Sequence, residues 1–114
     1  MNLKIKVWIE DENENLLFGG GKTKVLTQLD QTGSIIESAK QNDMSYDKVM
    51  KHIEILDNHV KEDLVLRLHG KSENSPTTYA LSVDARLVLQ AYEILQYDVK
   101  KYAKKRFKEL YAGK

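Results

Sequence analysis

Apolar and polar residues alternate strictly at the start of the chain. Every second residue from position 3 to 10 is apolar, and this period of two predicts a β-strand. The inward side of the strand would carry Leu3, Ile5, Val7 and Ile9. The polar run at 11–15 predicts a turn, and residues 16–18 return as a second strand. We therefore expect an N-terminal β-hairpin over residues 3–18.

The spacing of apolar residues then becomes helical. A helix is expected from about Lys22 to Gln31, and Gly33 suits the left-handed cap that often ends a helix. Two shorter helices follow within residues 34–60. Asn42 and Asp43 separate them, and both residue types tolerate the left-handed turn conformation. Two short helices joined by a tight turn predict a helix-turn-helix motif, whose usual partner is double-stranded DNA.

Serines mark the starts of both short helices. Ser34 can cap the first helix, with Glu37 completing a capping box, and Ser45 can cap the second. Ala39 is small enough for the two helices to cross closely. The buried faces are expected to hold Ile35, Ile36 and Ala39 in the first helix and Val49, Met50, Ile53 and Leu56 in the second.

The remaining residues predict a second hairpin and a long helix. Strands are expected at 64–69 and 77–81, in the position of a wing directly after the second motif helix. Ser82 then caps a helix that reaches about Tyr111, roughly 45 Å long at 1.5 Å per residue. The pattern as a whole predicts a single α+β domain over residues 1–114. Its parts are a winged helix-turn-helix with an N-terminal hairpin (3–18), a three-helix core (22–60), a wing (64–81) and a dimerisation helix (82–111).

The long helix carries two apolar stripes with the three-four spacing of coiled coils. One consists of Ala85, Val88, Tyr92, Leu95, Val99 and Tyr102, and the other of Leu87, Ala91 and Ile94. The helix is too long for one small domain to cover, so one stripe can pack on the domain and the other on a second copy. The alternative is that both stripes face a single core. The residues expected at a homodimer interface are Val88, Tyr92, Leu95, Val99 and Tyr102.

Three short motifs resemble the DNA-binding domain of the ModE-type molybdate-responsive regulators. They read Thr32-Gly-Ser-Ile35, Ala39-Lys40 and Met44-Ser-Tyr46, where the family pattern is close to SGSIS…AK…GISYK…W. A weaker likeness extends from the first strand to the long helix. The resemblance implies a winged helix-turn-helix of the LysR-like kind, dimerised through its last helix. The family senses molybdate through separate C-terminal domains, so the resemblance implies no oxyanion ligand or other cofactor for residues 1–114.

The outer side of the second motif helix, residues 45–59, is expected to enter the major groove, whose width of about 12 Å accepts a helix. The alternative is a solvated helix face. Two residues depart from the family pattern: Asp47 stands where Lys or Arg is common, and Met50 where Trp is common. The candidates for DNA contact are Ser34, Ser45, Tyr46, Lys48, Lys51 and His52, with Arg67 and Lys71 on the wing.

The charge distribution favours a second interpretation. Net charge is +1, but residues 100–114 hold seven basic groups and one acid, which leaves 11 basic and 16 acidic groups in the first 99 residues. DNA-binding domains usually show the opposite bias. The alternative function is therefore a winged-helix protein-interaction module that has lost DNA binding. The basic tail itself suits nucleic acid, acidic protein or anionic lipid, or serves as a solubilising helix end.

The sequence gives little evidence for phosphate binding, metal binding or catalysis. Gly19-Gly-Gly-Lys-Thr23 resembles the end of a P-loop, but position 16 is Leu16 where that pattern requires glycine. His52, His59 and His69 lack metal-ligand spacing, and no nucleophile with its base stands out, so we expect neither a metal site nor an enzyme.

The sequence has no cysteine and no apolar run near the ~20 residues of a membrane span, so a cytoplasmic location is expected.

Overall fold

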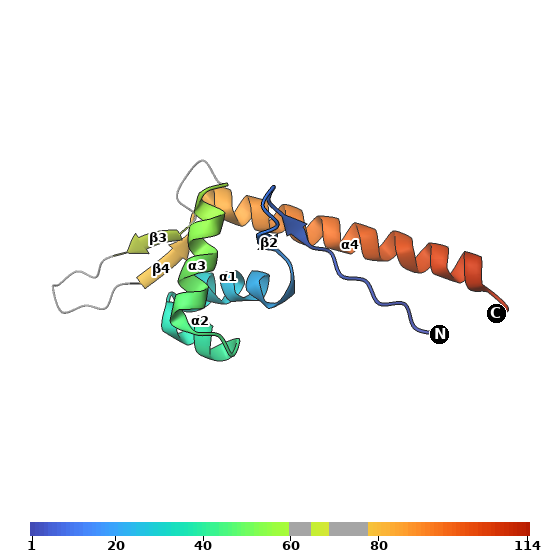
Figure 1. Cartoon of the computed structure of the whole chain (residues 1–114), viewed down its shortest axis with the longest axis horizontal. Helices are drawn as coiled ribbons and strands as arrows, with labels where there is room; N and C mark the ends of the chain where they lie inside the picture. The colour runs from blue at the N-terminus through green and yellow to red at the C-terminus, as the bar shows by residue number, and fades with distance from the viewer. Residues whose placement is uncertain (60–64, 69–77) are drawn as a thin grey trace.

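The computed structural model of the protein describes residues 1–59, the backbone of 65–68, and residues 78–114. These parts form a mixed α+β structure, 66 × 28 × 23 Å in extent, with a helical body at one end and a long helix that projects from it (Figure 1). The strands form two separate antiparallel pairs, β1–β2 and β3–β4. The elements are β1 (Ile9–Glu10), β2 (Leu16–Phe18), α1 (Gly20–Thr32), α2 (Ile35–Gln41), α3 (Tyr46–Asp57), β3 (Val65–Leu68), β4 (Thr78–Leu81) and α4 (Val83–Tyr111).

The N-terminal hairpin is shorter than the sequence predicts. The first strand begins at Ile9, not at Leu3, and pairs with β2 through Ile9 and Phe18. Asp11 organises the turn, because its carboxylate accepts hydrogen bonds from the amides of Asn13 and Asn15 at 2.8 and 2.9 Å. From Ile5 to Ile9 the chain nevertheless keeps the predicted alternation of half-buried and exposed side chains, whereas Leu3, predicted to face inward, is exposed. The half-buried side chains of this segment are covered by α4 and not by a neighbouring strand.

The residues predicted to cap helices do so, but α1 begins at Gly20, two residues before the predicted start at Lys22. Gly33 ends α1 with φ +71°, and its amide donates to the carbonyl of Leu29, as a left-handed cap does. Ser82 begins α4, where its hydroxyl accepts a hydrogen bond from the amide of Ala85 at 3.1 Å. The carbonyl of Gly33 also accepts a hydrogen bond from the amide of Tyr79 at 2.9 Å. This bond ties β4 to the junction between α1 and α2.

The hydrophobic core lies where the three body helices, β2, β4 and the start of α4 meet. Only the first part of α4 contributes to it, through Ala85, Leu89 and Tyr92. The rings of Tyr92 and Phe18 stack with their centroids 5.7 Å apart. The core members are Leu17, Phe18, Val25, Leu26, Leu29, Ile35, Ala39, Val49, Ile53, Leu56, Leu81, Ala85, Leu89 and Tyr92.

The second hairpin is confirmed as a pair of strands. β3 and β4 run antiparallel with Val65 opposite Leu81 and Leu68 opposite Thr78. Arg67 takes part through its backbone, opposite Tyr79, whereas Lys71 lies outside the described residues. Among the helices in the described ranges, none is long and apolar enough to cross a membrane.

Candidate nucleic-acid interface

The junction between α2 and α3 is a tight, internally bonded turn. Asp43 takes the left-handed conformation at φ +56°, as predicted, and the amide of Met44 donates to the carbonyl of Ala39 at 2.9 Å. The side-chain amide of Asn42 donates to the Ser38 carbonyl at 2.8 Å and also bonds the side chain of Gln28 in α1. Ala39 is buried, as its small size requires at a close crossing. The turn thus holds α2 and α3 in a defined relation to each other and to α1.

Both predicted serine caps form. The Ser34 hydroxyl accepts a hydrogen bond from the Glu37 amide, and the Ser45 hydroxyl accepts one from the Lys48 amide, each at 3.1 Å. The capping box is only half made, because the amide of Ser34 donates to Thr32 Oγ1 at 3.2 Å and not to the Glu37 side chain. Ser45 remains exposed while it caps. A hydroxyl and free amides are therefore presented together at the start of α3, where the helix dipole is positive.

The buried face of α2 differs from the prediction at one position. Ile36 is 61% exposed, and Ser38 takes the inward place beside Ile35 and Ala39. The spacing explains the change, since Ile35, Ser38 and Ala39 follow the three-four pattern of one helix face, whereas Ile36 is turned about 100° from Ile35. Ile36 adds an apolar side chain to the outer surface of the motif.

The helix α3 divides cleanly into an inner and an outer face. Val49, Ile53 and Leu56 are buried against the body. Of the eight predicted contact residues, four lie at the start of α3 or along it, outside this face, and are exposed. They are Ser45, Tyr46, Lys48 and Lys51.

The middle of the outer face carries charges of both signs. Asp47, Lys51 and Glu54 follow one another at spacings of four and three, which places them in a row along the exposed side. Lys48 and Tyr46 flank this row on opposite sides, at 100° per residue. The charge on the exposed face of α3 is therefore mixed, with the lysines beside the acids.

His52 is not part of this outer surface, and the prediction of an exposed histidine is wrong. It is 3% exposed, and neither ring nitrogen has a hydrogen-bond partner within the described part of the chain. Burial, with a smaller effect from the nearby Lys22, lowers the pKa of His52 to about 4, so the ring is neutral at pH 7. The signal was present in the sequence: His52 follows Val49 by three and precedes Leu56 by four, on the apolar face of α3.

The predicted dimer residues on α4 separate into two groups. Tyr92 is buried in the core of its own chain, and its hydroxyl donates to the carbonyl of Val7 at 2.8 Å, so its assignment to a dimer interface is wrong. Past Tyr92 the helix leaves the body, and apolar side chains stay uncovered by this chain, with Tyr102 65% exposed. Several apolar residues of α4 are exposed, and six of them share one side of the helix. These six, here called the α4 stripe, are Leu87, Val88, Ile94, Leu95, Val99 and Tyr102.

The start of the α4 stripe borders a hollow of about 390 Å³ between α3, β2 and α4. Leu87 and Val88 line it from α4, and Leu17, Phe18 and Leu56 line it from the body. The apolar surface of α4 therefore continues into the body and forms one extended face.

Ligand-binding alternatives gain no support from the side-chain arrangement. Over residues 1–59 and 78–114, no three His, Cys, Asp or Glu side chains gather in a group suited to a metal ion. His59 lies beside Asp11, with 3.3 Å between Nε2 and Oδ2. In the glycine run, the amide of Gly19 donates to the Thr23 hydroxyl at 2.8 Å, which ties the run to the start of α1.

No protein-family model matches this sequence, and no curated protein matches it either.

Proposed function

We propose that the protein is a homodimeric regulator that binds double-stranded DNA through a winged helix-turn-helix similar to that of the ModE-type regulators. The observation that carries the proposal is the unit formed by α2, α3 and the β3–β4 hairpin. The two helices are held by the turn at Asp43, and the hydrogen bond from Tyr79 to Gly33 attaches the following hairpin to their base. A helix-turn-helix followed by a hairpin is the arrangement in which α3 enters the major groove and the hairpin acts as a wing.

The outer face of α3 supplies the contacts in this proposal. Ser45 and Tyr46 present hydroxyls at the start of the helix, where phosphate oxygens are attracted to the positive end of the helix dipole. Lys48 and Lys51 reach phosphates or guanine. Asp47 accepts a hydrogen bond from cytosine N4 and disfavours approach to phosphate, so it contributes base selection. Lys and Asp side by side suit a site that reads sequence with modest non-specific affinity.

The second copy is proposed to cover the α4 stripe in an antiparallel arrangement. The first half of α4, residues 83–98, contains three acids and one base, whereas residues 100–111 contain six bases and one acid. Antiparallel pairing places each basic half beside the acidic half of the partner and so favours this direction. It also brings the C-terminal turns of one copy, with the exposed Leu110, toward the hollow bordered by Leu87 and Val88 of the other. A two-fold dimer of this kind would present two α3 helices to successive major grooves, about 34–36 Å apart.

The test is a titration of the purified protein with random-sequence duplex DNA across a range of salt, followed by selection of preferred sequences. The expected result is binding that weakens steeply with salt and an enriched palindrome. Replacing Lys48 and Lys51 with Gln removes four charges per dimer and should lower the slope of log K against log salt by up to about 4 units. The control Lys101→Gln/Lys105→Gln removes equal charge from α4 and should keep sequence preference. Because Lys105 follows Leu87 by five helical turns and so lies on the side of the α4 stripe, sedimentation must first show that the control is still a dimer. Absence of binding by the unaltered protein at low salt would overturn the proposal.

A second candidate, a winged-helix module that binds another protein, is favoured by one observation. The centre of the exposed face of α3 alternates acid, base and acid along Asp47, Lys51 and Glu54. Such a row pairs readily with a complementary helix or strand, and the exposed Ile36 on α2 adds apolar area. The DNA titration separates the two functions, because a protein-binding module is expected to show no salt-dependent affinity for duplex DNA.

A further inference from the structure

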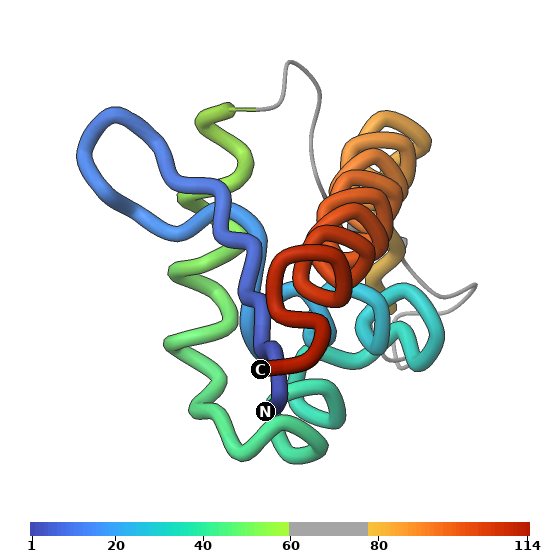
Figure 2. Tube along the Cα trace, turned by 90° about the vertical axis from the view of Figure 1, so that its right-hand side faces the viewer, coloured from blue at the N-terminus to red at the C-terminus, as the bar shows by residue number. Residues whose placement is uncertain are grey.

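The N-terminal segment, residues 1–8, runs antiparallel to α4 along its projecting half. Its carbonyl at Val7 accepts the hydrogen bond from Tyr92, and farther out residues 3–6 lie beside Lys100 and Lys104. Met1 reaches Phe107 near the end of the helix. Figures 1 and 2 show the segment beside α4 in both views, with the two chain ends close together. Residues almost 100 positions apart in the sequence are thereby brought into one surface.

Four lysines, two from the N-terminal segment and two from α4, line one groove on this surface. Lys4 and Lys6 from the segment and Lys100 and Lys104 from α4 line a shallow groove of about 360 Å³ together with Leu3 and Ile5. Lys4, Lys6 and Lys104 are exposed and Lys100 is half-buried. None of the four forms an ion pair with an acidic side chain in the ranges that the structure describes. Like charges held this closely repel one another, and a bound polyanion would relieve that repulsion. We call these four residues the lysine groove.

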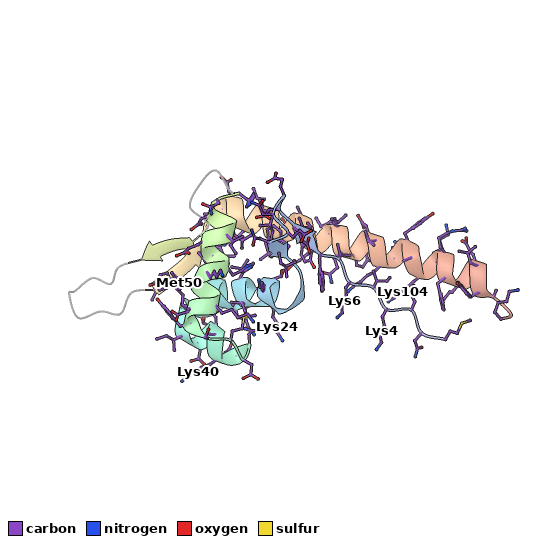
Figure 3. All side chains as sticks on the ribbon, viewed as in Figure 1. Lys4, Lys6, Lys24, Lys40, Met50 and Lys104 are labelled. Carbon is purple, nitrogen blue, oxygen red and sulfur yellow. The ribbon has the colours of Figure 1, made fainter. Side chains whose placement is uncertain are left out.

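The lysine groove faces the same side of α4 as the helical body. Lys104 follows Arg86 by 18 residues, which is five turns of an α-helix, so the two project in nearly the same direction. Arg86 bonds Asp30 in α1 and therefore marks the side of α4 on which the body lies. Figure 3 agrees, since the labelled Lys4, Lys6, Lys24 and Lys104 all lie below the axis of α4, as α1 and α2 do.

The groove stays open in the proposed dimer. At 100° per residue, Lys100 and Lys104 are turned about 140–180° from Leu95 and Tyr102, and about 80–140° from Ile94 and Val99 of the α4 stripe. A second copy that covers the stripe therefore leaves both lysines free. They lie roughly 25–32 Å along α4 from its first residue, Val83, which is within one half-site spacing of 34–36 Å.

From these relations we infer that the lysine groove binds the sugar-phosphate backbone of the duplex between the two half-sites. The inference rests on the proposed function and extends its DNA surface from α3 to the N-terminal segment and the basic half of α4. Duplex DNA is favoured over an anionic membrane because the lysines lie on the side of α4 on which the helical body lies. Such contacts are to backbone and add affinity without reading bases.

The experiment compares two double variants on two duplexes. Lys100→Gln/Lys104→Gln removes groove charges, whereas the control Lys101→Gln/Lys105→Gln removes equal charge from the next residue in each case, turned about 100° around α4. The affinity of each variant is measured at several salt concentrations for two duplexes, the complete selected site and one half-site alone. On the complete site the groove variant should lower the slope of log K against log salt by about 2–4 units more than the control. On the half-site the two variants should agree.

A third variant, Lys4→Gln/Lys6→Gln, tests the N-terminal contribution and should reproduce the groove variant, with thermal unfolding as a check that the fold is kept. Equal slopes for groove and control variants on the complete site, with the unaltered protein binding normally, would overturn this inference and leave the proposed function intact. Failure of the unaltered protein to bind any duplex would overturn both. Binding to phosphatidylserine vesicles that is lost in the groove variants, with an unchanged DNA slope, would assign the lysines to a membrane and overturn the inference.

Discussion

Asp30 in α1 and Arg86 in α4 form a two-pronged ion pair. The guanidinium donates from Nε to Oδ2 at 2.9 Å and from Nη2 to Oδ1 at 2.8 Å, and the amide of Leu81 donates to the same Oδ1 at 3.0 Å. The hydrogen bonds from Arg86 lower the pKa of Asp30 below its usual value. A single carboxylate therefore joins the first helix, the last strand and the long helix, and it fixes the direction in which α4 leaves the body.

Substitutions at this pair should have unequal costs. Arg86 is more than half-exposed, and water screens its charge, so Arg86→Ala is expected to destabilise the protein only slightly. Asp30→Ala also leaves the Leu81 amide without its acceptor and should cost about 2 kcal/mol. Asp30→Asn keeps an acceptor for that amide and should fall between the two. Urea unfolding measures all three, and equal costs for Arg86→Ala and Asp30→Ala would show that the bond to Leu81 contributes nothing.

The buried ring of His52 should make stability depend on pH. Its pKa is about 4 in the folded protein and about 6.5 when unfolded, so the unfolded chain binds the proton more tightly. Stability is therefore full above about pH 6.5 and falls as the pH drops toward 4, by about 3 kcal/mol in total. The pKa of Asp11, lowered to about 2 by hydrogen bonds from Asn15, affects stability only below that window. Urea unfolding between pH 7 and 4 measures the effect.

Two variants at His52 separate titration from packing. His52→Leu and His52→Gln should both flatten the dependence on pH between 7 and 4, because neither side chain titrates there. Only His52→Leu should also raise stability at pH 7, since it removes the two unpaired ring nitrogens from the core. A dependence on pH that persists in both variants would place its source elsewhere in the chain.

The hydroxyl of Tyr92 should hold the N-terminal segment against α4. Tyr92→Phe keeps the ring in the core and removes only the bond to the Val7 carbonyl, at a cost of about 1 kcal/mol. Cleavage by trypsin after Lys4 and Lys6 should then become faster, while cleavage within α1 should be unchanged until the protein unfolds. Equal protection of the segment in both proteins would mean that the side chains of Ile5 and Val7 suffice to hold it.

An acidic residue in the α4 stripe should prevent dimer formation. Leu95→Glu places a carboxylate in the middle of the apolar surface, and sedimentation should then report the monomer mass at concentrations where the unaltered protein is a dimer. Lys104→Glu introduces the same group on the opposite side of α4 and should leave the mass unchanged. A monomer mass for the unaltered protein at all concentrations would contradict the proposed homodimer.

The helix caps and the tight turn could be predicted from the sequence because each depends on neighbouring residues. Ser34, Ser45 and Ser82 cap helices as predicted, Gly33 ends α1, and Asp43 makes the left-handed turn. Each of these relies on a hydrogen bond or backbone preference within four residues of its position. The length of α4 follows in the same way from its start signal and from a long run without a breaker.

The errors concern what each apolar face is packed against. The alternation before Ile9 indicated a strand, but the partner surface is α4, which preserves the alternation without strand pairing. Tyr92 fits a coiled-coil spacing equally well whether it meets a second copy or its own core. The burial of His52 was open to sequence reasoning, since its neighbours at three and four residues are apolar, but its polar ring favoured an outward placement.

The sequence by itself determined which serines and which glycine cap helices, which residues make the tight turn, and that α4 would extend beyond the body. Only the tertiary structure decided how α4 divides between the core and the exposed stripe, and that the N-terminal segment lies along it. The bond from Tyr92 to Val7 and the groove that Lys4 and Lys104 both line bring together residues 85 and 100 positions apart. Such contacts depend on the direction in which α4 leaves the body, which the packing of Leu89 and the pair of Asp30 with Arg86 set, and no local spacing encodes that direction.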